Sequence, residues 1–390
     1  MKGLPTIGVV GAGAMGSGIA QIAAQAGHAV ILVDHSKSAL DRSAASLSKI
    51  ADKLVKKGKW SATVSKRIQS SIHRTSEIER LSTCQWVIEA IVEDISVKHS
   101  LFQSLEAIVS PGAVLATNTS SLSVTSIAGK LQYPERFIGL HFFNPAPLMA
   151  LVEVIPALQT DHSHVDKAVA LMEAWGKSPV VAKDTPGFIV NRVARPFYGE
   201  ALRIFEEGLA SPQTIDAAMR NAGFRMGPFE LMDLIGNDVN YAVSCSVFEA
   251  FYNDPRYRPS LIQKQHVDAG WLGRKSDKGY YEYEKGNEIS GGDILTNTKE
   301  FDWIVKRIVS MLINEAADAL YLKIASAKDL ETAMKKGVNY PKGLLAWCNE
   351  WGTKTTLNIL ENLQNHYGDD RYRPSPKLRD LIAQRSEFII

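Results

Sequence analysis

The chain has 390 residues, of which 45% are hydrophobic and 22% are charged. This composition excludes intrinsically disordered, collagen-like and disulfide-scaffold proteins, and the length indicates two or three domains. Lys and Arg total 44 against 42 for Asp and Glu, so the net charge of +2 gives no reason to expect a nucleic acid partner.

The three cysteines, Cys84, Cys245 and Cys348, lie more than 100 residues apart. That spacing matches neither paired metal ligands nor a disulfide framework, so we expect no metal site and a reducing compartment. The chain opens on an apolar run without a basic leader, and no apolar run reaches the roughly 18 residues that a membrane span needs. We therefore expect a soluble, cytoplasmic protein that contacts no membrane.

Short β-branched runs at residues 6–10 and 29–33 flank a stretch of small residues from Ala14 to Ala26 with helical spacing. This order predicts a strand, a helix and a second strand. Further apolar runs at 86–88, 113–116 and 137–140 alternate with helical patterns such as Ile95–Val109. Residues 1–184 are therefore expected to form an α/β Rossmann-type, doubly wound parallel sheet.

A glycine motif follows the first strand and opens the first helix: Gly11-Ala12-Gly13-Ala14-Met15-Gly16. Dinucleotide-binding loops require this context. Gly11 permits a tight turn, Gly13 lets the backbone approach a pyrophosphate, and Gly16 lets helix and strand pack closely. The phosphates would lie against the helix N–H groups of the motif, which includes Ala14 and Met15. A plain strand-to-helix turn is the alternative.

The second strand ends at Asp34, 18 residues after Gly16. A carboxylate there can accept hydrogen bonds from the adenosine ribose. Its charge would repel the 2′-phosphate of NADP, and no arginine lies adjacent to it in the sequence. The expected cofactor is therefore NAD.

His141 and Glu153 are the only titratable residues in the apolar runs 137–145 and 151–155. A turn with prolines could bring these runs side by side. A buried carboxylate would then fix the imidazole tautomer and favour the imidazolium, an arrangement worth about 10²- to 10⁴-fold in rate. The residues alone leave open the alternative of a core histidine satisfied by one carboxylate.

After Asp184 the strand pattern gives way to helical patterns, which predicts a helical domain over residues 185–285. A linker rich in Gly, Asn and Ser follows between Glu284 and Thr298. A shift of 115 residues then places Arg192, Glu200 and Tyr257-Arg258-Pro259-Ser260 on Arg307, Glu315 and Tyr372-Arg373-Pro374-Ser375. We expect residues 296–390 to form a second, structural helical copy that arose by duplication. Shared helix-favouring residues are the alternative explanation.

Four blocks closely resemble the 3-hydroxyacyl-CoA dehydrogenase family over residues 6 to about 283: Asn118-Thr119-Ser120-Ser121-Leu122, Gly139-Leu140-His141-Phe142-Phe143-Asn144-Pro145, Leu151-Val152-Glu153, and Asp184-Thr185-Pro186-Gly187-Phe188-Ile189-Val190-Asn191-Arg192. The resemblance implies reversible, NAD-dependent oxidation of (S)-3-hydroxyacyl-CoA to 3-oxoacyl-CoA, in fatty acid or related acyl-CoA metabolism.

The same resemblance implies roles for individual residues. His141 would be the base and Glu153 its orienting carboxylate, while Ser120 and Asn191 would hold substrate oxygens and Asn144 would lie near the nicotinamide. Read alone, Ser120 could equally cap a helix, and Asn191 could be an ordinary polar residue of a helix.

Further family positions fall on Glu93, Lys98 and Lys275 as NAD contacts, and on Lys57 or a neighbour as the contact to the CoA nucleotide. Asp277 departs from the family because a glycine is usual there. Lys53, Lys56, Lys57 and Lys59 could instead form a solvated basic helix end.

Two other functions stay open. One is an NAD-dependent dehydrogenase of a CoA-free hydroxy acid, and the other is a non-catalytic dinucleotide-binding protein. Since single-copy family members pair through their helical domains, the second copy predicts a monomer that imitates a dimer, with a homodimer as the alternative.

Overall fold

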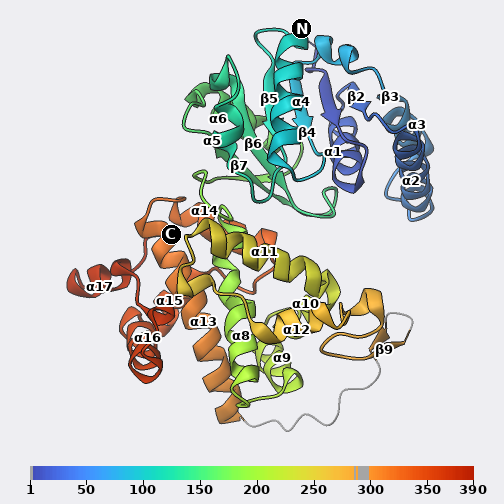
Figure 1. The fold of residues 1–390 in the computed structure, drawn as a ribbon. Helices are drawn as coiled ribbons and strands as arrows, with labels where there is room; N and C mark the ends of the chain where they lie inside the picture. Colours follow the sequence, from blue (N-terminus) through green and yellow to red (C-terminus); the bar gives the residue numbers. More distant parts are fainter. Residues whose placement is uncertain (1–2, 285–286, 289–297) are drawn as a thin grey trace. The chain divides into compact units, whose positions relative to one another are not determined.

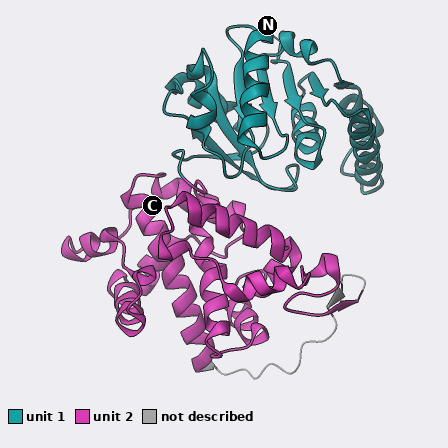
Figure 2. Cartoon of the chain, in the orientation of Figure 1, with its two compact units in different colours: residues 1–185 teal, residues 186–390 magenta. Residues whose placement is uncertain are grey.

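The computed structural model describes residues 3–284, 287–288 and 298–390. The chain divides into two compact units, residues 1–185 and residues 186–390 (Figure 2). Most of the linker predicted between Glu284 and Thr298 lies outside the described residues. Both helical copies belong to the second unit, and the division of that unit into two domains stays a prediction.

The first unit is built on one sheet of eight strands, in the order β3-β2-β1-β4-β5-β6-β7-β8. The strands are β1 (Ile7–Val10), β2 (Val30–Val33), β3 (Ile72–Thr75), β4 (Trp86–Glu89), β5 (Val114–Thr117), β6 (Phe137–Phe142), β7 (Leu151–Pro156) and β8 (Ser178–Val181). All neighbours are parallel except β6 and β7. The predicted Rossmann-type sheet is confirmed. The antiparallel exception arises because the β6–β7 connection is too short for a crossover helix.

Helices connect these strands (Figure 1). They are α1 (Ala14–Gln25), α2 (Lys37–Lys56), α3 (Ala62–Ser70), α4 (Ile95–Ile108), α5 (Val124–Ala128) and α6 (His162–Ala174). Local sequence fixes several starts: Ser36 caps α2, Asp94 caps α4 and Asp161 caps α6 through side-chain oxygens.

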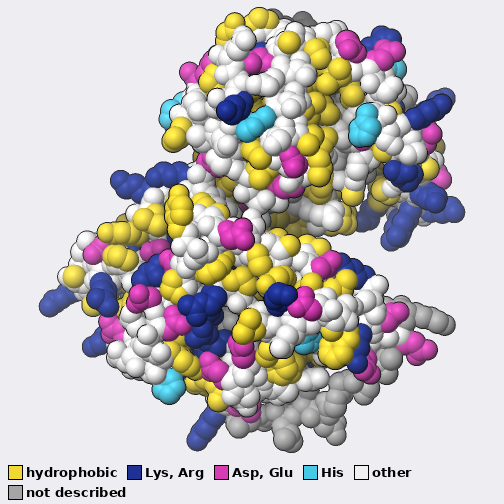
Figure 3. Space-filling view, viewed as in Figure 1, with side chains coloured by type: hydrophobic (Ala, Val, Ile, Leu, Met, Phe, Trp, Pro, Cys, Tyr) yellow, Lys and Arg dark blue, Asp and Glu magenta, His cyan; other side chains and the backbone are white. Residues whose placement is uncertain are grey.

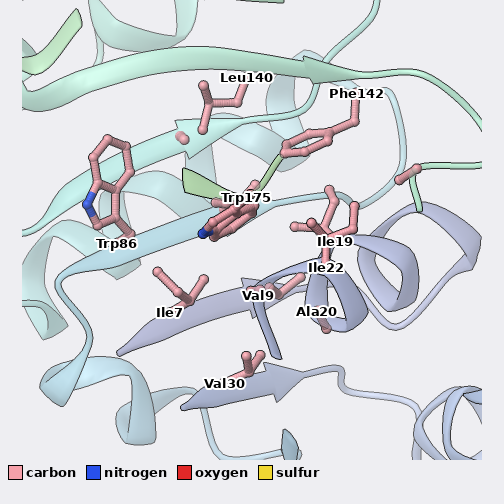
Figure 4. Close-up of a cluster of buried hydrophobic side chains, with 14 of the residues drawn as sticks. Ile7, Val9, Ile19, Ala20, Ile22, Val30, Trp86, Leu140, Phe142 and Trp175 are labelled. Carbon is pink, nitrogen blue, oxygen red and sulfur yellow. The ribbon is translucent and has the colours of Figure 1, made fainter. Parts of the chain in front are cut away.

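The sheet is covered on both faces. On one face, Ile19 and Ile22 of α1 join strand residues and Trp175 in a buried cluster (Figure 4). On the other, Phe102 of α4 packs edge-on against Phe137 of β6, with ring centroids 4.7 Å apart. Phe137 and its neighbour Ile138 point to opposite faces because side chains alternate along a strand. Each fully buried Ile or Phe contributes about 1.5–3 kcal/mol.

The second unit contains two runs of helices in the same order. The first comprises α7 (Val190–Val193), α8 (Arg195–Glu206), α9 (Pro212–Asn221), α10 (Pro228–Ile235), α11 (Asn237–Ala250) and α12 (Leu261–Asp268). A short hairpin of β9 (Tyr283–Glu284) and β10 (Asn287–Glu288) follows. The second run comprises α13 (Thr298–Tyr321), α14 (Ala327–Gly337), α15 (Leu344–Trp351), α16 (Thr353–Tyr367) and α17 (Pro376–Ala383).

The two copies meet through a reciprocal network of buried charges. Arg192 Nε lies 2.5 Å from Glu315 Oε1, and the residues related to them by the duplication, Arg307 and Glu200, pair at 3.0 Å. The Tyr257 hydroxyl donates to Glu315, while that of its counterpart Tyr372 donates to Glu200. Each copy therefore offers an arginine to the other copy's glutamate, which is the reciprocity of a twofold interface.

Candidate active site

The glycine loop has the geometry expected from its sequence. Gly11 adopts a φ of +104°, and a Cβ at this position would lie 2.4 Å from the Ala90 carbonyl oxygen. A Cβ on Gly16 would lie 1.8 Å from the Gly11 carbonyl oxygen, whereas one on Gly13 would meet nothing within 4 Å. Gly11 and Gly16 are therefore required for the turn and its packing, and Gly13 leaves open space at the N-terminus of α1.

Asp34 joins the ends of two neighbouring strands. Its Oδ2 accepts a hydrogen bond from the Ala12 amide at 2.7 Å, and its Oδ1 accepts one from the Ser36 amide at 2.8 Å. The side chain is 13% exposed. Because an ionised carboxylate has about four lone-pair sites, Asp34 keeps acceptor capacity for a ligand beside the glycine loop.

His141 and Glu153 form a buried pair. They lie opposite each other on the antiparallel strands β6 and β7, so both side chains point to the same face of the sheet. His141 Nδ1 is 2.6 Å from Glu153 Oε2, and the two residues are 6% and 0% exposed. The ring of Phe143 lies 4.5 Å from the imidazole, centroid to centroid. The expected side-by-side placement of the two runs is confirmed.

Glu93 holds the loop that follows β5. Its Oε1 accepts hydrogen bonds from the Thr119 hydroxyl at 2.6 Å and from the Ser120 amide at 2.8 Å. Burial alone would raise the pKa of the Glu93 carboxyl, but these bonds and the charge of Lys98 hold that pKa below its ordinary value. Helix α5 is capped by Ser123, so the capping role considered for Ser120 does not apply.

Lys98 lies in the interior of the first unit. Its side chain is 1% exposed, and its ammonium contacts Glu89 at 2.5 Å and Glu93 at 3.3 Å. Glu89 also accepts a hydrogen bond from the Thr117 hydroxyl. Glu89 was not among the residues predicted for the site. The one feature of the sequence that marks it is its position as a carboxylate at the end of an apolar strand. Direct contact of Glu93 or Lys98 with NAD stays a prediction.

A cavity of about 860 Å³ lies between α1, α2 and the turn after β6. It is lined by the glycine loop, by Asn144 and by basic residues that include Lys53, Lys57 and Lys59, but not by Lys56. These lysines lie in the last turn of α2 or directly after it, and Figure 3 shows dark-blue side chains gathered around this helix. Residues of the glycine loop, Asn144 and Lys57 therefore line the same cavity of the first unit.

Two predicted site residues belong to the second unit. Asn191 lies in the short helix α7. Lys275 is half exposed, and its ammonium contacts both oxygens of Asp238, at 2.5 and 2.7 Å. Asp277 adopts a φ of +55°, which explains why a glycine suits this position.

The described residues contain no cluster of His, Cys, Asp or Glu suited to a metal ion. Within the same ranges, every helix is too short or too polar to cross a bilayer.

Comparison with family models gives matches along nearly the whole chain. The model for the NAD binding domain of 3-hydroxyacyl-CoA dehydrogenase matches residues 6–185. The model for the C-terminal domain of that enzyme matches twice, over residues 187–283 and 303–386. The double match agrees with the duplication expected from the sequence.

Individual relatives point the same way. The 3-hydroxyadipyl-CoA dehydrogenase of Escherichia coli is 39% identical, with 100% of this chain and 99% of that protein covered. The human mitochondrial hydroxyacyl-coenzyme A dehydrogenase is 40% identical over 71% of this chain and 90% of its own length. A crystal structure of 3-hydroxybutyryl-CoA dehydrogenase from Escherichia coli matches with a TM-score of 0.91 and 38% identity, covering 98% of this chain and 99% of that one.

Proposed function

The chain belongs to the 3-hydroxyacyl-CoA dehydrogenase family, and we propose that His141, oriented by Glu153, is the base with which it works. The protein is an oxidoreductase that uses NAD to oxidise the 3-hydroxyl of a 3-hydroxyacyl-CoA. One observation carries the proposed role of His141: the 2.6 Å contact between its Nδ1 and the buried Glu153 carboxylate.

The residues around the glycine loop fit NAD. NAD held there would supply the acceptor for the hydride of C3 of the substrate. The open space over Gly13 suits a diphosphate at the backbone N–H groups of α1, among them those of Ala14 and Met15. Asp34 has acceptor sites for a ribose, and its charge disfavours the extra phosphate of NADP. We assign Glu93, Lys98, Asn144 and Lys275 to the same cofactor on the family resemblance.

His141 moves the proton. Since Nδ1 faces Glu153, the proton of the substrate hydroxyl passes to Nε2. An imidazolium forms, and the negative charge of Glu153 stabilises it in a site that water reaches poorly. In the reverse direction, reduction of a 3-oxoacyl-CoA, the same nitrogen returns the proton.

Ser120 and Asn191 bind the substrate oxygens in this proposal. Ser120 lies on the loop that Glu93 holds in place, and Asn191 lies at the start of the helical unit. Polar groups of this kind orient the reacting carbon and stabilise charge that develops on the carbonyl or thioester oxygen.

Lys57 is the proposed contact for the CoA nucleotide. It is exposed and lines the cavity of about 860 Å³ together with Lys53 and Lys59. The ammonium groups give this wall a positive charge, which suits the phosphates of CoA.

The names of the relatives indicate two kinds of acyl chain for the substrate. Relatives that cover nearly the whole chain carry two names, one for a 3-hydroxyadipyl-CoA and one for a 3-hydroxybutyryl-CoA dehydrogenase. These two substrates differ in length and in a carboxylate at the far end of the acyl chain. We propose that the substrate is one of these classes.

We also propose that the protein is a monomer. The buried pairs Arg192–Glu315 and Arg307–Glu200 support this, because the second helical copy occupies the interface that a partner would otherwise form. The expected mass in solution is 42.8 kDa, and a light-scattering mass of twice that value would contradict the proposal. Three unpaired cysteines support a reducing, cytoplasmic location.

An absorbance assay of NADH oxidation tests the activity. Acetoacetyl-CoA should be reduced, and free hydroxy acids should give no reverse reaction with NAD. Turnover of free hydroxy acids alone would favour the CoA-free alternative, and no turnover of either would favour a non-catalytic dinucleotide-binding protein.

A further inference from the structure

Arg195 lies one helical turn after Asn191, at the start of α8. Its Nε donates to the Asn191 carbonyl oxygen at 3.0 Å, and its Nη1 donates to the Ser244 hydroxyl at 3.3 Å. The guanidinium carbon lies 5.0 Å from the centroid of the Tyr198 ring. These contacts fix the guanidinium while leaving most of its five donors without a described acceptor.

Arg195 differs from three other arginines of the same unit, because within the described ranges it has no carboxylate partner. Arg192, Arg256 and Arg307 each contact a glutamate of the other copy. Among the residues that the structure describes, no carboxylate forms an ion pair with Arg195. Burial lowers the pKa of Arg195, with the Tyr198 and Tyr340 hydroxyls acting in the opposite sense. A desolvated cation without a counter-ion is costly, so such a place favours an anionic ligand.

Further hydrogen-bond donors lie in the same surroundings. Tyr198 and Tyr340 are each 6% exposed, and both interact electrostatically with Arg195. The Tyr340 hydroxyl is buried and has no hydrogen-bond partner in the described structure. A carboxylate beside the guanidinium could accept hydrogen bonds from such hydroxyls as well as from Arg195.

The second helical copy shows that the fold does not require this arginine. Lys306, Ser310 and Ile313 occupy the positions of Asn191, Arg195 and Tyr198 in α13. Lys306 pairs with Asp302 on the surface, and Ser310 is fully buried. The continuous helix α13 covers the positions that α7 and α8 occupy in the first copy, and the arginine occurs only in the copy that carries Asn191.

We propose that Arg195 binds the terminal carboxylate of a dicarboxylic 3-hydroxyacyl-CoA and so selects the tail of the substrate. Two α-carbons one turn apart are separated by about 6 Å along a helix, a distance that a tail of a few carbons beyond C3 can cover from Asn191. This inference rests on the proposed function, because it places the reacting end of the substrate at Asn191. It makes 3-hydroxyadipyl-CoA a better substrate than a monocarboxylic acyl-CoA of equal length.

Steady-state kinetics with 3-hydroxyadipyl-CoA and 3-hydroxyhexanoyl-CoA test the inference, since the two substrates differ only in the terminal carboxylate. The wild-type protein should prefer the dicarboxylic substrate in kcat/KM. Arg195→Met should lower kcat/KM for that substrate by about 10- to 100-fold and leave the other nearly unchanged. Arg195→Lys should restore part of the loss, and Arg225→Met, which removes an exposed arginine, should change neither value.

Other outcomes separate the two levels of the argument. An equal loss on both substrates would overturn the inference, because it would indicate a structural role or a contact with CoA itself. Equal kcat/KM values for wild type would overturn it too. Failure of wild type to oxidise either substrate would instead contradict the proposed function.

Inhibition of the wild-type protein provides a test that does not depend on a variant folding. Adipyl-CoA and hexanoyl-CoA lack the 3-hydroxyl and differ only at the tail. Adipyl-CoA should inhibit at a concentration about tenfold or more lower than hexanoyl-CoA. Equal inhibition constants would overturn the inference.

Discussion

Replacing Glu153 with Gln isolates the contribution of its charge to catalysis. Gln has nearly the same shape and can still accept a hydrogen bond from His141 Nδ1, now at 2.6 Å from the carboxylate. The variant should therefore keep the ring in place but lose the negative charge that stabilises the imidazolium. Because Glu153 is fully buried, solvent screening of this charge is weak.

The size of the effect follows from the separation of the two charges. Unit charges about 4 Å apart, a fair distance between their centres here, interact by about 4 kcal/mol at an effective dielectric constant near 20. Since about 1.4 kcal/mol corresponds to tenfold in rate, full loss of this term would lower kcat by about 10³-fold. Partial compensation by the Gln amide lowers the expected loss to about 10²- to 10³-fold.

The assay is the reduction of acetoacetyl-CoA followed through NADH absorbance. KM and the Kd for NADH should stay within about threefold of wild type, because the variant leaves the binding residues intact. Glu173→Gln removes an exposed carboxylate from α6 of the same unit and serves as the matched control. A kcat for Glu153→Gln within about threefold of wild type, or an equal loss in the control, would refute the reasoning.

Four further predictions concern other parts of the structure. Arg192→Met removes one of the two arginines that contact the buried Glu315, so the free energy of unfolding in urea should fall by about 1–3 kcal/mol, and an unchanged value would count against this role. Burial would raise the pKa of Glu315, but Arg192 and Arg256 hold that pKa below the ordinary value of 4.5. The free energy of unfolding should therefore fall as the pH drops below 4.5 and Glu315 takes up a proton. Urea titrations that show no such decrease would count against the ion pairs of Glu315. Gly13→Ala should fold normally, because the added Cβ meets no atom within 4 Å, but it should weaken NADH binding by about tenfold. Gly16→Ala should lower the Tm strongly, because its Cβ would lie 1.8 Å from the Gly11 carbonyl oxygen. A Tm loss for Gly13→Ala with a normal Tm for Gly16→Ala would contradict the roles assigned to these glycines. Lys57→Ala should raise KM for acetoacetyl-CoA by about two- to fivefold and Lys56→Ala should not, since only Lys57 lines the cavity; equal KM values for the two variants would argue against the CoA contact.

Some of the candidate site could be predicted because its signals are local. The glycine motif sets its own turn, and Asp34 ends the strand beside it, so spacing alone places them together. His141 and Glu153 are isolated polar residues in apolar runs joined by a short turn, which favours pairing across two strands. The shift of 115 residues predicted the duplication, but it gave no indication that Arg192 and Glu315 form an ion pair.

The remainder depends on contacts between distant segments. Lys98 has the sequence surroundings of an exposed helix residue, yet it is buried because Glu89, at the end of a neighbouring strand, neutralises it. Arg195 is distinguished by the absence of an acid around it among the described residues, and no local pattern reports that. Strands β3 and β8 are short and partly polar, so they carry little periodic signal.

In the proposed reaction, His141 exchanges the proton of the substrate hydroxyl. The most direct measurement is kcat of His141→Gln for the reduction of acetoacetyl-CoA, with the Kd for NADH measured in parallel by fluorescence. The variant should lose about 10²- to 10⁴-fold in kcat and bind NADH with a Kd within about twofold of wild type. A near-normal kcat, with the fold and NADH binding intact, would contradict it.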